Sequence, residues 1–351
     1  MKKICIVGAG LFGTTLALVL SRNKNIKIDI YEKNSDIMDE TSLKNQQRFH
    51  LGYHYPRSKK TVYEIKKSSI EFLKFYGKNI FGNTKNIYGI SDKNSKISFS
   101  HYCKKINDFG LKINKKKFDI FSSLVSNSII TNEKNLNFFK LKKKISKKIK
   151  QANNIKLFLS KSIDKKYLSY YDKVIICTYS NNNYLLYKFG VKKSLLKKKR
   201  YELVEKIIVK MPKKLKKLSV VILDGNFLNF DPFVGTNYHL LSVVKEAKIE
   251  VVNAKLPNFK NPRKNFLKYK FIKNKKMSNY KKFINTGKKL IPELRNAKYI
   301  KSAYVVRCIN KSQNSQDRKT TLNFYGDKLI TVFSGKWNNC VKIAKEINKI
   351  I

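Results

Sequence analysis

The stretch that decides the fold is KICIVGAGLFG, residues 3–13. The run before its first glycine predicts a short buried strand, and residues 14–22 have the apolar density of a packed helix. Between these elements, Gly8 allows a tight turn, Gly10 lets a pyrophosphate approach the backbone, and Gly13 permits close packing of helix on strand. Because the unpaired N–H groups at a helix start attract anions, the stretch predicts the phosphate-binding turn of a βαβ unit.

An acidic residue follows at the spacing that such a turn requires. A second strand is predicted over Lys27–Tyr31, and Glu32 stands directly after it, nineteen residues beyond Gly13. A carboxylate at that place can accept hydrogen bonds from an adenosine ribose, and it disfavours a 2′-phosphate. The glycines, the flanking elements and the acid together predict a dinucleotide-binding domain.

The start of the chain has a competing interpretation as a secretory signal peptide, because Met1–Lys3 precedes an apolar run that continues to Leu20. Three glycines interrupt that run, and no small-residue cleavage site follows before the charged segment Arg22–Lys27. No other window approaches the length of an apolar membrane span. We therefore expect a cytoplasmic protein.

Length and cysteine content indicate the class of protein. A chain of 351 residues can bury a large core and is expected to form two domains. Its five cysteines are scattered and form no CxxC pair, so we expect neither a disulfide framework nor a metal site.

The net charge of +54 raises the question of a nucleic-acid partner. Only eight of the 77 basic residues are arginine, the residue that usually makes bidentate contacts to phosphates and bases. The densest basic runs, Lys140–Lys150 and Lys192–Arg200, are typical of solvated faces. Leu141, Ile145 and Ile149 form an apolar stripe at helical spacing that predicts docking on a sheet. We expect no nucleic-acid partner, while contact with an anionic membrane surface stays open.

The order of the predicted elements indicates one domain interrupted by another, in an α/β fold. Helices are expected over residues 61–76, 134–151 and 277–291. Strands are expected over residues 155–159, 173–178, 205–209, 218–223, 227–230, 238–244 and 303–308, with turns at 224–225 and 231–232. A Rossmann-like domain with a mostly parallel sheet is expected to comprise residues 1–85, 128–195 and 301–351. The α+β domain that interrupts it, with an antiparallel sheet, is expected to comprise residues 86–127 and 196–300.

The C-terminal segment predicts a second anion-seeking helix start. A strand over Leu329–Phe333 leads into Ser334-Gly335-Lys336, and a helix with Trp337 on its apolar face follows. A protein that binds a nucleotide with one βαβ unit does not require this element. A flavin enzyme has a use for it, because a helix dipole or a lysine would stabilise the negative charge that the isoalloxazine gains on reduction.

With both ends in view, the chain resembles the FAD-dependent D-amino-acid oxidase superfamily. Within it, the chain is most similar to the FAD-dependent glycerol-3-phosphate dehydrogenases and the L-2-hydroxyglutarate dehydrogenases. The resemblance is carried by Gly8, Gly10, Gly13 and Glu32, by Thr41-Ser42, by Arg48–Tyr55, by Asp172–Thr178 and by Ser334–Trp337. It implies an FAD-binding domain interrupted by a substrate domain, and hydride transfer to flavin N5 from a carbon that carries an amine or hydroxyl group.

The resemblance also implies a set of residues that contact FAD. These are Gly8, Gly10, Leu11, Phe12, Gly13, Glu32, Lys33, Thr41, Ser42, Arg48, Thr178, Gly335, Lys336 and Trp337. Two departures from the family pattern concern the middle of the chain. Tyr179-Ser180 stands where the family commonly has a glycine beside the cofactor, and no second acidic flavin-ribose motif of the disulfide-reductase type is evident.

Three residues are candidates for substrate chemistry. Arg307 is expected on a late strand, where the family places a substrate-anchoring arginine, and a guanidinium suits bidentate capture of carboxylate or phosphate. An ordinary ion pair at a strand end is its alternative. His50 and His54 lie four residues apart, so on a strand they would point the same way, and either can serve as the base or hydrogen-bond the flavin. Their alternative is a structural role.

Several other polar residues are expected to organise loops. Arg318 follows Asp317 and is expected to stabilise its own loop, with substrate contact as the alternative. Asp224 and Asp231 stand in turn sequences, and a turn role is the expectation.

The sequence thus predicts an FAD-dependent oxidoreductase, an oxidase or dehydrogenase acting on a small amino acid, hydroxy acid or related anionic metabolite. Its electron acceptor and the covalency of the flavin stay open. One alternative is an NAD-dependent dehydrogenase. The other is a basic protein that binds nucleic acid or a membrane surface and is built on a nucleotide-binding fold.

Overall fold

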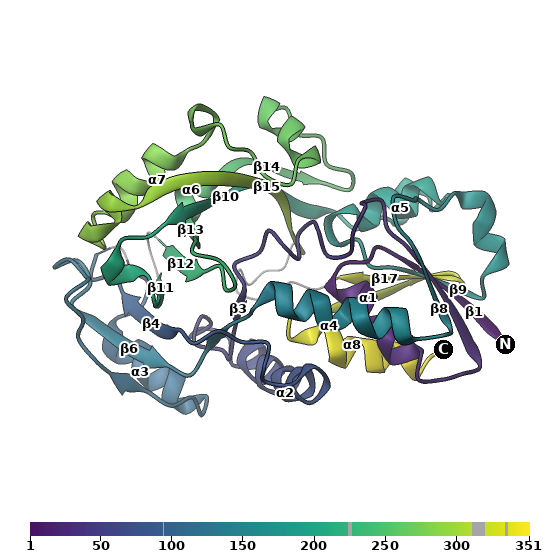
Figure 1. The fold of residues 1–351 in the computed structure, drawn as a ribbon, viewed down its shortest axis with the longest axis horizontal. Coiled ribbons are helices and arrows are strands. Elements are labelled where there is room, and N and C mark those ends of the chain that lie inside the picture. The colour runs from purple at the N-terminus through teal and green to yellow at the C-terminus, as the bar shows by residue number, and fades with distance from the viewer. Residues whose placement is uncertain (94, 224–226, 311–319, 334–335) are drawn as a thin grey trace.

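The computed structural model describes residues 1–93, 95–223, 227–310, 320–333 and 336–351. Its elements form two domains that lie side by side, with both chain termini in the same domain (Figure 1). The expected positions Asp224, Arg318 and Gly335 lie outside the described residues.

The first domain is built on a sheet of six strands in the order β16-β17-β9-β1-β2-β8. The strands are β1 (Lys2–Val7), β2 (Ile26–Tyr31), β8 (Ile155–Phe158), β9 (Lys173–Ile176), β16 (Thr321–Tyr325) and β17 (Leu329–Phe333). All neighbours pair in parallel except β16 and β17, which are antiparallel. This mostly parallel sheet is the one that the sequence predicts, and β17 has the predicted bounds.

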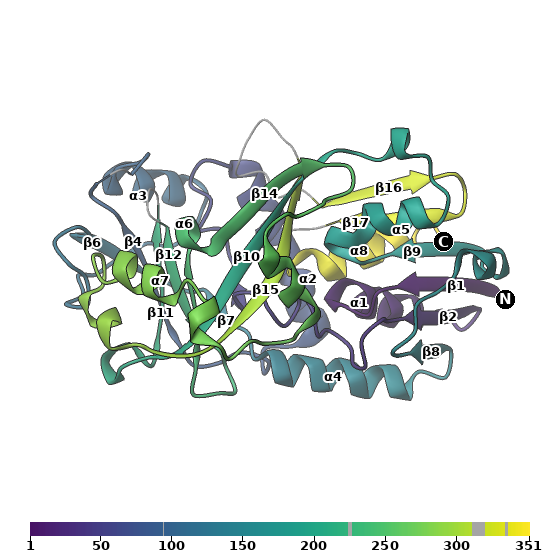
Figure 2. The same ribbon diagram turned by 90° about the horizontal axis from the view of Figure 1, so that it is seen from above.

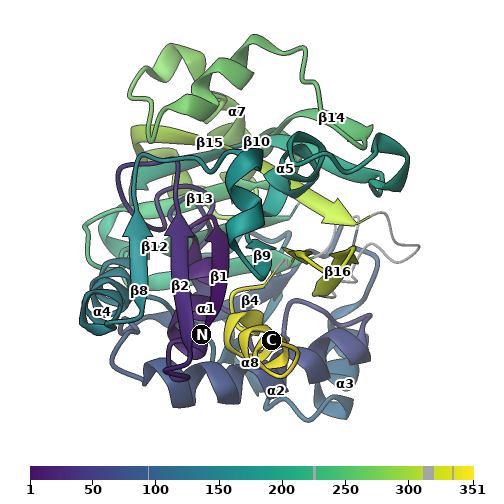
Figure 3. The same cartoon turned by 90° about the vertical axis from the view of Figure 1, so that its right-hand side faces the viewer.

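Helices cover both faces of this sheet, as the buried apolar runs Ile4–Val7 of β1 and Val174–Ile176 of β9 require. Ile4 and Ile6 of β1 share a core with α1 (Leu11–Leu20), α4 (Phe138–Gln151) and α8 (Asn339–Asn348). Cys5 and Val7 point the other way and pack with α5 (Asn182–Lys188). Figure 3 shows α5 on the opposite side of the sheet from α8. On α4, the stripe Leu141, Ile145 and Ile149 is buried, as predicted.

The second domain is built on a nine-stranded sheet in the order β14-β10-β13-β12-β11-β4-β6-β5, with β15 on the other side of β10. The strands are β4 (Lys85–Ile90), β5 (Asn114–Lys115), β6 (Asn127–Thr131), β10 (Lys199–Lys210), β11 (Leu218–Leu223), β12 (Leu228–Pro232), β13 (His239–Val243), β14 (Lys248–Ala254) and β15 (Lys298–Asn310). Its pairing is antiparallel except between β11 and β4. Figure 2 shows the long pair β10 and β15 running side by side.

Shorter elements join and cover the two sheets. The helices are α2 (Lys59–Tyr76), α3 (Phe99–Asp108), α6 (Val244–Ala247) and α7 (Tyr280–Gly287), and a two-stranded ribbon is formed by β3 (Arg48–Phe49) and β7 (Lys134–Asn135). Turns of 3₁₀ helix occur at Lys165–Tyr170, Tyr179–Asn181, Lys193–Leu195, Lys213–Leu215, Pro262–Lys268, Lys275–Met277 and Pro292–Asn296.

The structure shifts several expected boundaries. The whole of β15 pairs with β10, so residues 301–310 belong to the second sheet rather than to the first domain. Residues 128–131 lie in β6 and also belong to the second sheet. The helix expected from residue 134 begins at Phe138, because Lys134–Asn135 pairs with β3 instead. Long-range strand pairing decides each of these boundaries.

The expected turn role of Asp231 is wrong. Asp231 lies within β12, where it is opposite Leu240 of β13, and Pro232 is opposite His239. The Asp-Pro pair is typical of turns, but here it lies at the end of a strand, where proline is tolerated.

Candidate functional site

The glycine turn between β1 and α1 has the close packing that the sequence predicts. Gly8 adopts a φ of +100°, a conformation that favours glycine. A Cβ added at Gly13 would lie 1.9 Å from the Gly8 carbonyl oxygen, so only glycine fits where the helix crosses the strand. At Gly10, by contrast, a Cβ would have one described heavy atom within 4 Å, the Ser42 Oγ at 3.5 Å. The backbone at Gly10 is therefore approachable.

Glu32 lies against this turn. Its Oε2 accepts a hydrogen bond of 2.8 Å from the Ala9 N–H, and its Oε1 accepts one of 3.0 Å from the Asn34 N–H. The carboxylate is buried at the end of β2, beside the start of α1. This is the placement at which the ribose of a dinucleotide bound at the turn would be recognised.

The other expected contacts of the first domain lie around the turn or near it. Ser42 Oγ accepts a 3.1 Å hydrogen bond from the Leu11 N–H, which brings the loop with Thr41 to the start of α1. Thr178 packs against Gly8, since a Cβ there would lie 2.9 Å from the threonine Cγ2. Lys33 instead lies at the surface, 3.6 Å from the Glu40 carboxylate.

The loop after β3 and the segment before α8 come together in space, although almost 290 residues separate them in sequence. Asn338 donates a 2.9 Å hydrogen bond from Nδ2 to the His50 carbonyl and one of 2.6 Å to Ser69 Oγ. The Lys336 ammonium lies 4.5 Å from the centre of the Tyr55 ring. Trp337 is half-buried against the core of the first domain. The two segments that carry the flavin resemblance therefore form one site.

His50 and His54 lie in an irregular loop rather than on a strand, yet their rings are neighbours with centroids 5.5 Å apart. Neither Nδ1 atom has a hydrogen-bond partner among the described residues. Burial lowers the pKa of His50, and the nearby charge of Lys336 lowers it further, against the opposing effect of Glu133. Burial holds the pKa of His54 well below its usual range, and the charge that His50 carries when it is protonated lowers it further. Both imidazoles are therefore neutral at pH 7 and can accept a proton.

Arg48 lies in a buried ionic network beneath these histidines. Its Nη2 is 2.8 Å from Asp231 Oδ1 and its Nη1 is 3.5 Å from Glu133 Oε2. It also donates to Ser219. The described partners of this guanidinium are thus protein side chains, and the network ties β3 to the second sheet.

Glu133 is a residue of this site that sequence reasoning did not identify. Its carboxylate accepts hydrogen bonds from the Leu51 N–H at 2.8 Å and the Tyr88 hydroxyl at 2.7 Å, and it lies 3.7 Å from His50 Nδ1. Burial alone would raise the pKa of Glu133, but His50 and Arg48 together lower it to about 2. No local motif marks this position, because its partners come from two distant segments, residues 48–51 and Tyr88.

Arg307 lies on the late strand where the sequence predicts it, near the end of β15. Its guanidinium forms an ion pair with Glu202, which lies opposite it on β10 and is buried. The arginine side chain is 39% exposed, so part of it is free of the protein interior. The ion-pair alternative is therefore present in the structure, and an anchoring role stays a prediction.

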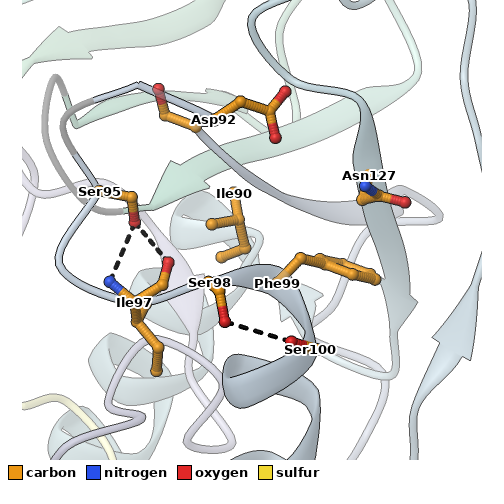
Figure 4. Close-up of a pocket in the computed structure, with 9 residues that line it drawn as sticks. Ile90, Asp92, Ser95, Ile97, Ser98, Phe99, Ser100 and Asn127 are labelled. Atoms are coloured by element: carbon orange, nitrogen blue, oxygen red, sulfur yellow. Dashed lines mark hydrogen bonds between the residues drawn. The ribbon is translucent and has the colours of Figure 1, made fainter.

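A surface hollow of about 510 Å³ lies between the ends of β4 and β6 and the start of α3 (Figure 4). Serine side chains and Asp92 line it, beside the start of α3. None of the expected site residues is among those that line it.

Within the described ranges, no helix is long and apolar enough to cross a membrane.

One family model matches the start of the chain. Residues 6–63 match the family model of an NAD(P)-binding Rossmann-like domain. A FAD-dependent monooxygenase from Fusarium mangiferae is 26% identical over 97 residues, which make up 28% of this chain and 26% of that protein. The chain thus matches about a quarter of the length of this curated relative.

Solved structures match over nearly the whole chain. Glycine oxidase from Geobacillus kaustophilus is similar with a TM-score of 0.70 at 12% identity, over 99% of this chain and 93% of that one. L-proline dehydrogenase from P. horikoshii has a TM-score of 0.71 at 12% identity, over 99% and 92% of the two chains. L-α-glycerophosphate oxidase from Mycoplasma pneumoniae, with FAD bound, has a TM-score of 0.70 at 14% identity, over 99% and 94%. The predicted fold is confirmed: this chain shares the overall fold of these solved oxidases and of the dehydrogenase.

Proposed function

We propose that this protein is an FAD-dependent oxidoreductase that oxidises a carbon bearing an amine or hydroxyl group in a small anionic metabolite. The observation that carries the proposal is the convergence of two distant segments. The loop His50–Tyr55 and the segment Lys336–Asn338 lie against each other in the structure. The comparisons support the cofactor, because the glycerophosphate oxidase of the same fold has FAD bound.

The residues at the turn fit FAD. Gly10 leaves its backbone open, and the N-terminus of α1 offers N–H groups to a pyrophosphate. Glu32 lies where an adenosine ribose would be hydrogen-bonded. At the other end of the site, Lys336 brings a positive charge beside Tyr55 and His50. These residues would hold opposite ends of one long cofactor.

FAD, when bound, supplies the acceptor for the hydride that leaves the substrate carbon. The protein's own residues then have three tasks. A neutral imidazole of His50 or His54 accepts the proton of the substrate hydroxyl or ammonium group. Lys336 stabilises negative charge near that loop. Arg307 binds an anionic group of the substrate through the part of its guanidinium that is accessible beside Glu202.

Gly10→Ala provides the sharpest test of the cofactor. The Cβ would make only ordinary contact with Ser42 in the protein, and the backbone φ of −68° suits alanine, so the variant is expected to fold. The same methyl group would occupy the space that a pyrophosphate requires. We expect a yellow wild-type protein that releases FAD on denaturation, and at least tenfold weaker FAD binding by the variant, as measured by fluorescence titration. A wild-type protein that cannot be reconstituted with FAD would refute the proposal.

The substrate class is tested by anaerobic reduction of the loaded protein across a panel of amino acids, hydroxy acids and glycerol phosphates. Bleaching of the flavin by one of these compounds identifies the class. Arg307→Ala is expected to retain FAD and to be reduced at least tenfold less efficiently. An NAD-dependent dehydrogenase would instead be colourless and would reduce added NAD in the presence of its substrate.

A further inference from the structure

The second sheet presents one face to the first domain and the other to α7. Side chains alternate between the two faces along each strand. Ile207 and Leu241 point outward and share a core with Phe283 of α7. Ile208 and Leu240 point inward and share a core with residues of the first domain. The inner face is therefore the one that would adjoin a substrate held between the two domains.

A row of polar residues crosses the middle of this inner face. Ile207 lies opposite Leu241, so the adjacent positions Lys206 and Ser242 fall in one row. Ser242 in turn lies opposite Asn229 of β12. Hydrophobic residues would be expected where two domains pack, so a polar row here has a cost unless its groups have partners.

Two of these polar groups, on Lys206 and Asn229, lack hydrogen-bond partners among the described residues. Lys206 has no hydrogen bond or ion pair to any described residue and is half-buried in the middle of β10. The Oδ1 atom of Asn229 is buried and has no described hydrogen-bond partner. A half-buried ammonium without a counter-ion is costly, and burial together with the charge of Arg307 lowers the pKa of Lys206 to about 8.

Neither nearby carboxylate forms an ion pair with Lys206 among the described contacts, although Asp231 Oδ2 has no described hydrogen-bond partner. Asp231 accepts hydrogen bonds at Oδ1 from Arg48, Ser219 and Asn135. Glu202 is shared by Arg307 and Arg200. Both acids act on Lys206 only through longer-range attraction. Lys206 therefore has no close counter-ion among the described residues, and an anionic ligand can supply one.

The two cations of the inner face can act on one small molecule. Glu202 lies opposite Arg307, so both point to the same face as Lys206, four residues further along β10. This spacing of four residues separates the Cα atoms of Glu202 and Lys206 by about 13 Å along the strand. The lysine and arginine side chains are long enough to converge, and the charge of Arg307 already acts on Lys206.

We infer that Lys206 binds a second anionic group of the substrate, so that the protein selects dianionic metabolites over monoanionic ones. The inference rests on the proposed function and specifies its substrate class. Arg307 binds one anionic group, and Lys206 binds the other with Ser242 and Asn229 as hydrogen-bonding neighbours. Both a carboxylate and a phosphate monoester can be the second anionic group, because each offers negatively charged oxygens to the ammonium group of Lys206.

The test is isothermal titration calorimetry of the FAD-loaded protein with propionate, succinate and phosphoglycolate. Succinate adds a carboxylate to propionate, and phosphoglycolate supplies a phosphate in its place. A charge-assisted hydrogen bond implies a dissociation constant at least tenfold lower for one of the dianions than for propionate. Lys206→Met should abolish that preference, and Lys206→Arg should retain most of it. Lys210→Met removes the same charge from the exposed end of β10 and should have no effect.

The outcomes separate this inference from the proposed function. Loss of the dianion preference in Lys206→Met but not in Lys210→Met supports the inference, and the better dianion shows whether the group is a carboxylate or a phosphate. Equal affinity of the wild type for all three anions, absent binding of both dianions, or an unchanged preference in Lys206→Met overturns it. Absorbance of bound flavin is recorded on the same samples. A protein without flavin refutes the proposed function, whereas the calorimetry still decides the role of Lys206.

Discussion

Replacement of Glu133 by glutamine tests the buried network that supports the histidine loop. The change keeps the size of the side chain but removes the charge that faces Arg48 and His50. Arg48 is then left with Asp231 as its one described ionic partner. Breaking a buried ion pair from one side typically costs about 3–5 kcal/mol.

The pKa of Glu133 gives a second measure of the same magnitude. It falls from an ordinary 4.5 to about 2 in the folded protein, a shift that corresponds to about 3 kcal/mol of stability. Because the folded-state pKa is lowered, this contribution is complete above pH 4.5 and is lost as the pH falls towards 2. The variant should lack both the stability and this part of its dependence on pH.

Urea denaturation at several pH values between 3 and 7 measures both quantities. We expect Glu133→Gln to unfold with a free energy about 3 kcal/mol lower at pH 7, and the difference from the wild type to shrink as the pH is lowered. Glu346→Gln is the matched control, since it breaks only an exposed pair with Lys342 and should cost less than about 1 kcal/mol. A variant with the stability and pH profile of the wild type would refute the assignment of Glu133 to a strong buried network.

Three further predictions concern the site itself. Asn338→Ala removes the side-chain hydrogen bond to the His50 carbonyl. We expect the free energy of unfolding, measured by thermal denaturation, to fall by about 1–3 kcal/mol, and FAD binding to weaken. An unchanged free energy of unfolding and unchanged FAD affinity would show that this hydrogen bond is not needed. Gly13→Ala forces a methyl group against the Gly8 carbonyl oxygen, so we expect little folded protein by circular dichroism. A well-folded variant would contradict the close contact of α1 with the glycine turn. The pKa values of His50 and His54 are lowered, so the rate of anaerobic flavin reduction by substrate should be level from pH 8 to 6.5. The rate should fall only at lower pH, where the base becomes protonated. A fall that begins above pH 7 would exclude both histidines as the base.

Local signals in the sequence were sufficient for the first domain. The turn around Gly8 and the acid at Glu32 depend on residues within one βαβ unit, and the strand at Leu329–Phe333 has a continuous apolar run, so each is readable without knowledge of distant contacts. The His50 loop and Lys336 could be associated only through the family resemblance, since nothing local indicates that they meet.

The remainder of the site depends on contacts between distant segments. Glu133 acquires its role from Arg48, His50 and Tyr88, which lie on other elements. Asp231 has the local sequence of a turn but lies within a strand, because pairing with β13 overrides local preference. Burial and pairing across a sheet leave no pattern in the sequence at the residue concerned.

The packing of α8 against α1 has a consequence for how the protein is made. Residues 11–20 leave the ribosome early, yet the helix that covers them comprises residues 339–348. The strand β17, which joins the sheet beside β9, is also made late. During synthesis, the apolar surface of α1 therefore stays uncovered until more than 300 further residues, including those of α8, have been made. The nascent chain is exposed to aggregation through this surface, and the first domain can complete its core only after the second domain has been synthesised.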